Sequence, residues 1–277
     1  MRRINYVLSL VVLASFAFVS CTEDQAVVDD LSVPQDVVAQ IAALGFDVDN
    51  FIPTKFENGY LVEGDIYLTD QTIAEMGQPN KLASAEQYST NNLVSTGGSR
   101  TITMYAPTGR KGYSAGMIAG LDLAIARFNA ENLEISFQRV SSSGAADIVM
   151  KRLSKRDERR GVLGSAGFPT NSGDPYGQIL MSGILESSYG LSTEGIATII
   201  AHEMGHCIGF RHTDFFDRSI SCGGGTANEG DGGVGANHIP GTPTGANASQ
   251  KSWMLACTDG GDRPFNNDDK TALDYLY

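Results

Sequence analysis

Three histidines in residues 202–212 have the spacing of a catalytic metal site. The chain has 277 residues and four histidines, and His202, His206 and His212 lie in this short segment. Residues four apart in an α-helix lie on the same face, so His202 and His206 can share one ion. Three nitrogen ligands with one open coordination position are typical of catalytic zinc.

The residues between these histidines predict the remaining parts of such a site. Glu203 follows the first histidine, so it points away from the ligand pair and can act as a base on a water molecule at the metal. Gly209 can take a left-handed conformation that ends the helix and turns the chain back, which lets His212 supply the third nitrogen. An ordinary helix can carry two histidines by accident, but the glycine and the third histidine at fixed offsets disfavour that alternative.

Residues 202–212 read His-Glu-Met-Gly-His-Cys-Ile-Gly-Phe-Arg-His, which resembles the His-Glu-x-x-His-x-x-Gly-x-x-His motif of the metzincin zinc peptidases. The segment is most similar to the bacterial dual-action HEIGH metallopeptidases, with Met204 in place of isoleucine. The resemblance implies one catalytic Zn²⁺, Glu203 as the general base, and hydrolysis of peptide bonds in peptide or protein substrates. It also implies an α+β fold with a twisted mixed sheet, a long backing helix and an active-site helix.

The predicted elements of residues 100–277 agree with this metzincin-type, zincin-like domain. Alternation and apolar stripes predict, in order, a strand, a long helix and two strands at residues 101–106, 114–129, 133–137 and 146–150. The segment 161–168 resembles by its position the edge strand on which an extended substrate lies antiparallel. A glycine-rich strand at an ordinary sheet edge is the alternative. A further strand is expected at 178–182, and Ser192 is the expected N-cap of the zinc helix.

Residues 252–254, Ser-Trp-Met, resemble the Met-turn of the metzincins. The resemblance implies that Met254 packs beneath the zinc ligands as a soft hydrophobic floor and does not bind the metal. Some relatives have a tyrosine ligand two residues after this methionine, but this chain has Ala256 there. The difference favours a site with three histidines only.

The charge balance argues against nucleic acid as a partner. The chain has 20 basic and 32 acidic residues and a net charge of −12. The basic segment 151–160 alternates with acids, so we interpret it as a solvated turn or helix face and not as a binding patch. Residues 230–235 match a dinucleotide-binding glycine pattern, but no predicted strand precedes them. His238 is expected at the surface, with a place in the specificity pocket as the alternative.

Residues 1–20 have the pattern of a bacterial export signal. They begin with basic residues and continue with an apolar stretch that is too short to span a bilayer. The sequence around Cys21 resembles a lipoprotein cleavage box, which implies a diacylglyceryl group on Cys21; the alternative is an ordinary cleaved signal and a free cysteine. We expect an exported lipoprotein at the outer membrane or cell surface, with the periplasm or secretion as alternatives. Its only membrane contact would be through the lipid.

Residues 21–99 differ in character from residues 100–277 and predict a tether, a pro-segment and a linker. A helix is expected at 33–46, a strand at 60–68 after an Asn-Gly turn, and the linker at 78–99. Residues 62–66, Val-Glu-Gly-Asp-Ile, resemble the Phe-x-Gly-Asp-Ile box in the pro-peptides of astacin-type metzincins. In that box the aspartate fills the open position of zinc and keeps the enzyme latent.

The box makes Asp65 a candidate latency ligand and the chain a candidate zymogen. A carboxylate is a good zinc ligand and would displace the reactive water. The alternative is that the Gly-Asp pair is a turn or bulge in a small accessory sheet. A rival from another functional class is a surface lipoprotein that uses a capped metzincin fold for binding or adhesion, but Glu203 argues against it.

The remaining cysteines are consistent with export. Cys222 and Cys257 flank the glycine-rich region and the Met-turn, and a disulfide between them would stabilise the fold by about 3 to 4 kcal/mol in the loop-entropy model. Cys207 lies on the zinc helix away from the ligand face and is expected as a buried free thiol. We expect a monomer. The sequence leaves the substrate, the activation site and calcium binding to the acidic loops open.

Overall fold

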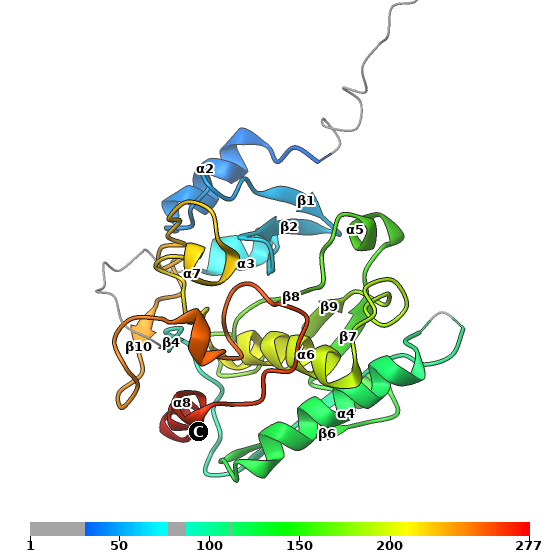
Figure 1. Ribbon diagram of the computed structural model, residues 1–277. Coiled ribbons are helices and arrows are strands. Elements are labelled where there is room, and N and C mark those ends of the chain that lie inside the picture. Colours follow the sequence, from blue (N-terminus) through cyan, green and yellow to red (C-terminus); the bar gives the residue numbers. More distant parts are fainter. Residues whose placement is uncertain (1–30, 77–86, 111) are drawn as a thin grey trace, which may run out of the picture.

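The computed structural model describes residues 31–76, 87–110 and 112–277 (Figure 1). The predicted signal peptide, the lipidation site Cys21 and part of the predicted linker lie outside the described residues. Within the described ranges, no helix is both long and apolar enough to cross a membrane.

An eight-stranded mixed sheet forms the frame of the molecule, in the order β1-β2-β3-β8-β9-β7-β5-β6. Strand β5 pairs in parallel with β6 and with β7, and β7 pairs in parallel with β9. Strand β8 runs antiparallel to β9. The fold class predicted from the sequence is therefore confirmed. The strands are β1 Thr54–Phe56, β2 Gly59–Val62, β3 Ile66–Leu68, β5 Arg100–Tyr105, β6 Ile135–Arg139, β7 Ile148–Arg152, β8 Gly164–Ala166 and β9 Gln178–Met181.

Two long helices, α4 Ala115–Ala130 and α6 Thr193–Ile208, pack together against this sheet (Figure 1). Ser114 and Ser192 cap their first turns by accepting hydrogen bonds from backbone N–H groups. The helices approach closely at Gly120, where an added Cβ would lie 2.4 Å from Ile196. This contact fixes α6, which carries the histidine motif, against the core.

Residues 31–76 form a small unit, the N-terminal unit, around the hairpin, by which we mean residues 59–68. The hairpin packs with α2 Gln35–Ala43 and α3 Asp70–Glu75 in a separate apolar cluster. The prediction of one strand over 60–68 was wrong, because β2 and β3 are antiparallel strands joined at residues 63–65. Glu63 and Gly64 both have positive φ values, 53° and 93°, so the chain reverses there.

Residues 87–94, which we call the inner segment, fall within the predicted linker but pack on the peptidase domain. Its strand β4 Tyr88–Ser89 pairs with β10 Asn237–His238. The Tyr88 side chain is fully buried and meets the Phe215 ring edge to face. Thr90 N–H donates to the carbonyl of Gly209, so the inner segment lies against the end of α6.

The remaining helices are short, apart from α8 at the end of the chain. They are α5 Lys155–Arg159, α7 Ser219–Cys222, α8 Asn267–Leu276 and the 3₁₀ turns Ser143–Ala145 and Ala248–Gln250. The solvated face predicted for the basic segment around α5 is only partly correct. Asp157 and Glu158 are buried there and pair with Arg160 and Arg152, so the alternating acids neutralise the neighbouring arginines.

Candidate metal centre

The end of α6 brings the three histidines of the motif together. The helix stops at Ile208, and Gly209 follows with φ 108°, a conformation that favours glycine. The chain then turns back toward the helix. His202, His206, His212 and Asp65 each offer a ligand atom, and these four atoms lie within 4.8 Å of one another.

Each histidine is oriented by a hydrogen bond from its outer nitrogen. Nδ1 of His202 lies 2.9 Å from the carbonyl oxygen of Trp253, and Nδ1 of His206 lies 2.9 Å from that of Phe210. Nδ1 of His212 lies 2.7 Å from a Glu229 carboxylate oxygen. These acceptors place a proton on each Nδ1, so each Nε2 faces into the cluster, where the nitrogen of a neutral ring can bind a metal ion.

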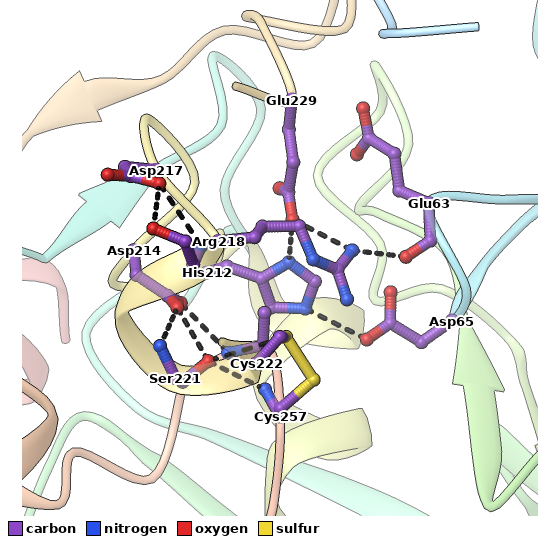
Figure 2. The surroundings of a disulfide bond; sticks show 12 residues. Glu63, Asp65, His212, Asp214, Asp217, Arg218, Ser221, Cys222, Glu229 and Cys257 are labelled. Atoms are coloured by element: carbon purple, nitrogen blue, oxygen red, sulfur yellow. Dashed lines mark hydrogen bonds and ion pairs between the residues drawn. A yellow bond between two sulfur atoms is a disulfide. The ribbon is translucent and has the colours of Figure 1, made fainter. Parts of the chain in front are cut away.

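Asp65 completes the cluster from the turn of the hairpin. Its Oδ2 lies 3.0 Å from Nε2 of His212 and 3.8 Å from Nε2 of His202 (Figure 2). The 3.0 Å contact is not aligned as a hydrogen bond, since Nε2 of His212 is a buried atom without a hydrogen-bond partner among the described residues. Three imidazole nitrogens and a carboxylate oxygen aimed at one point fit a tetrahedral zinc ion.

The electrostatics of the cluster suit a cation. Burial would raise the pKa of Asp65, but His212 and His202 hold it well below its ordinary value. Burial would lower the pKa of His212, but the charges of Asp65 and Glu229 raise it to about 10. Burial and the neighbouring histidines keep the pKa of His206 well below its ordinary value. The two carboxylates that attract a proton to His212 would equally attract a divalent ion.

Glu203 lies beside the cluster and faces β8. Burial, and then the charge of Asp65, raise its pKa well above the ordinary value. An added Cβ on Gly164 would lie only 2.5 Å from Oε1 of Glu203, so glycine is needed there to make room for the carboxylate. A raised pKa suits a group that must accept and return a proton near neutral pH.

Met254 lies beneath α6, at the position of the predicted Met-turn. It is fully buried, and an added Cβ on Gly205 would lie 2.6 Å from its sulfur. The Met254 carbonyl accepts from the backbone N–H of Thr213. The turn therefore supports both the helix and the chain that follows His212.

Glu229 is a residue of this site that the sequence interpretation missed. It is completely buried and contacts three cationic or polar partners, namely Nδ1 of His212 at 2.7 Å, Arg218 at 3.0 Å and Arg211 at 3.4 Å. Its pKa is lowered by these neighbours although burial alone would raise it. In the sequence, only the glycine-rich composition of the following loop could have drawn attention to Glu229. The backbone carbonyls of residues 230, 231 and 235 in this loop accept hydrogen bonds from Arg211.

The cysteines agree with two of the predictions. Cys222 and Cys257 form a disulfide that joins α7 to the chain after Met254 (Figure 2), and Cys207 is a buried free thiol. Asp214 also links these segments, because it accepts from Ser221 and from the backbone N–H of Ala256.

A cavity of about 280 Å³ opens beside Glu203 and Asp65. Its wall includes residues 161–164 of the segment that leads into β8, together with Arg218 and Arg263. His238 is exposed and does not belong to this wall. The cavity gives the cluster an approach for a substrate.

Comparison with protein families agrees with this site. The model of the dual-action HEIGH metallo-peptidases matches residues 60–277. One structure of myroilysin is 15% identical and has a TM-score of 0.37, covering 63% of this chain and 90% of that chain. A second myroilysin structure is 12% identical and has a TM-score of 0.35; the match covers 74% of this chain and 95% of that chain. The search of curated proteins gave no match.

Proposed function

This chain belongs to the dual-action HEIGH metallopeptidase family and is a zinc metallopeptidase, and we propose that it is an exported endopeptidase made as a latent zymogen. The observation that carries the proposal is the Asp65 carboxylate, 3.0 Å from Nε2 of His212 within a cluster of three histidines. The hairpin would have to leave before a substrate could enter.

His202, His206 and His212 would hold the zinc ion in the active state. When bound, zinc supplies a Lewis acid for the scissile carbonyl and for the attacking water. Glu203 would act as the general base that takes a proton from the attacking water and returns it to the leaving amine, and burial raises its pKa, which suits this role. Glu229 holds the proton of His212 on Nδ1, so that the ring presents Nε2 to the metal.

The hairpin covers the cleft in a way that supports latency. Strand β3 adds to the edge of β8, and the backbone N–H of Ala166 donates to the carbonyl of Asp65. The two strands are parallel, whereas we expect a substrate on this edge to lie antiparallel. The hairpin therefore occupies the backbone groups of β8, and its chain runs in the direction opposite to the one expected for a substrate.

The latency proposal is tested by Asp65→Ala in the full-length chain. We expect cleavage of denatured casein to rise at least about tenfold, because a carboxylate ligand competes directly with water for the open position. Asp49→Ala is the matched control, since Asp49 is an exposed acid of the same N-terminal unit. Adding Glu203→Gln to Asp65→Ala should abolish the gain. Equal activity of Asp65→Ala and wild type would contradict the role of Asp65.

We also propose export and lipid attachment at Cys21, which lies outside the described residues. The Cys222–Cys257 disulfide supports an oxidising compartment. Mass spectrometry of the N-terminal peptide from the native membrane fraction should find a diacylglyceryl group on Cys21, and Cys21→Ser should move the protein to the soluble fraction. An unmodified Cys21 in mature protein would contradict the anchor. We expect the enzyme to act as a monomer.

A further inference from the structure

The hairpin places a second acid, Glu63, beside two arginines of the peptidase domain. Arg218 donates to the carbonyl oxygen of Glu63 (Figure 2). The nearest Arg211 nitrogen lies 3.8 Å from the Glu63 carboxylate. Arg218 also lies near Asp65, since their charges interact. The turn of the hairpin thus carries one acid to the histidines and one to the arginines.

Glu63 fills this position poorly. Its side chain is completely buried and its backbone has a positive φ of 53°, which is strained for a residue other than glycine. Neither carboxylate oxygen has a hydrogen-bond partner within the described part of the chain. The Nε of Arg218 is likewise buried and without such a partner there. Arg218 therefore contacts the backbone carbonyl of Glu63, and no ion pair between it and the Glu63 carboxylate is found.

The N-terminal unit supplies much of the cover over Arg218. The ring of Phe51 lies 4.7 Å from its guanidinium carbon, and Gly64 lies against the same group. The peptidase domain itself holds Arg218 through Glu229, at 3.0 Å. Release of the hairpin would therefore expose an arginine that Glu229 keeps in position.

The charges around Arg211 and Arg218 also change when the hairpin leaves the cleft. In the peptidase domain, Glu229 pairs with both Arg211 and Arg218 and also with His212, and the charge of Asp214 acts on Arg218 as well. From the hairpin, Asp65 supplies a further negative charge, whereas burial and the charge of Glu229 raise the pKa of Glu63 well above its ordinary value. When Asp65 leaves, the wall of the cavity beside Glu203 loses a negative charge and keeps Arg218 and Arg263, although the whole chain carries a net charge of −12. A positive cleft in an acidic protein favours an acidic ligand.

We propose that the released peptidase selects substrates with an acidic side chain near the cleaved bond, and that Arg218 is the specificity-determining residue. This inference rests on the proposed function, because it requires the hairpin to leave the cleft. A substrate carboxylate that is free of the turn can approach Nε of Arg218, which Glu63 does not reach.

Arg211 and Arg263 are less suitable for this role. Arg211 is 1% exposed, and its guanidinium already donates to three backbone carbonyls. Arg263 lines the same cavity, but it donates to the carbonyl of Cys257 and lies 3.4 Å from Asp259. Both arginines have partners within the peptidase domain that remain after the hairpin leaves.

The test uses full-length chain that has been activated by limited proteolysis, with peptides blocked at both ends. Each peptide carries glutamate, glutamine or leucine at one of three positions on either side of the cut. We expect glutamate to raise kcat/KM about tenfold or more over glutamine at one position, as for a hydrogen bond to a charged group. Salt at high concentration should reduce this ratio.

Arg218→Gln should lower the ratio of glutamate to glutamine to about one; the readout is the ratio and not the overall rate, because Arg218 also contacts Glu229, which orients His212. The surface variant Arg139→Gln, which removes one partner of the exposed Asp122 pair, should keep the wild-type ratio. If Arg218→Gln lowers kcat/KM equally for all peptides, the proposal is contradicted. It is also contradicted if Arg263→Gln, and not Arg218→Gln, removes the preference for glutamate over glutamine. A need for a free C-terminal carboxylate would also contradict it.

The wild-type measurements separate this inference from the function on which it rests. If activated wild type cleaves no peptide and no casein, the proposed endopeptidase function fails. If it cleaves well but prefers glutamate over glutamine at no position, only the acidic specificity fails. Because this second outcome is measured on wild type alone, it tests the acidic specificity even if Arg218→Gln does not fold.

Discussion

The hairpin and the inner segment both precede the predicted peptidase domain, residues 100–277, but they contact different kinds of surface. The hairpin contacts the histidine cluster, Arg218 and the edge of β8. The inner segment covers the parts that support them. Gln87 donates to Ser252 and Asp269, and the Val94 N–H donates to the hydroxyl of Tyr277.

The apolar contacts of the two segments differ in the same way. Most residues that pack with the hairpin belong to the N-terminal unit itself, and the domain contributes Phe168 and the partly buried Val234 to this cluster. A smaller cluster pairs hairpin residues with Leu153, Val162 and Leu180. In contrast, Val94 belongs to the main core of the peptidase domain. We therefore interpret the hairpin as a removable cover and the inner segment as a permanent part of the domain.

The largest expected effect comes from two truncations that differ only in the inner segment. A chain that begins at Gln87 should fold and cleave casein, whereas one that begins at Arg100 should not fold. Loss of the buried Tyr88 side chain alone costs about 3 to 5 kcal/mol, which is a large share of a total stability of about 5 to 15 kcal/mol.

Both truncations should be made with Glu203→Gln as well, so that self-cleavage is not mistaken for unfolding. Thermal melting and zinc content then report the fold. If the two inactive chains are equally stable, the inner segment does not stabilise the domain, and the proposed difference between it and the hairpin is wrong.

A smaller effect is expected from Asp269, which receives a hydrogen bond from Gln87. Burial raises the pKa of Asp269 to about 7, from an ordinary value of 3.8. Between these values the folded protein keeps a proton that the unfolded chain has lost, so the free energy of unfolding falls as the pH rises through this window. The slope is at most about 1.4 kcal/mol per pH unit.

Urea unfolding of wild type and Asp269→Asn at pH 5 and pH 7.5 measures this contribution. The difference in stability between the two proteins should change with pH, because asparagine does not titrate. The docking of the hairpin is not expected to change with Asp269. Parallel pH profiles for the two proteins would show that Asp269 does not carry the dependence.

The zinc helix could be predicted in detail because its determinants are local. Histidine spacing, the Ser192 cap and the glycine at 209 all act within about one helix length. The five strands of the sheet from β5 to β9 and the Cys222–Cys257 pair also followed from patterns and cysteine positions. The fold class was thus within reach of the sequence.

The missed features depend on contacts that are distant in sequence. Glu229 acts on His212 from a loop that has no periodicity, and only the folded loop shows it. The inner segment is polar in composition, and it is buried because its backbone and side chains find partners more than a hundred residues away. The reversal at residues 63–65 depends on positive φ at Glu63, which residue preference does not predict.

The smallest expected effect is that of Phe51→Ala on latency. The ring of Phe51 lies 4.7 Å from the Arg218 guanidinium carbon, and such a cation–π contact contributes about 0.5 to 2 kcal/mol. Residual casein cleavage by the full-length chain should therefore rise a few-fold, well below the effect of Asp65→Ala. Ile52→Ala is the control, since Ile52 is the next residue and 76% exposed.

A double-mutant cycle of Phe51→Ala with Arg218→Gln decides whether this effect passes through the arginine. If it does, Phe51→Ala should add nothing to the latency lost in Arg218→Gln. If the two changes are additive, Phe51 stabilises only the N-terminal unit, and Arg218 is not part of the contact that holds the cover. If Phe51→Ala activates as strongly as Asp65→Ala, the cover is held mainly by packing, and the carboxylate at the histidines follows the hairpin without fixing it.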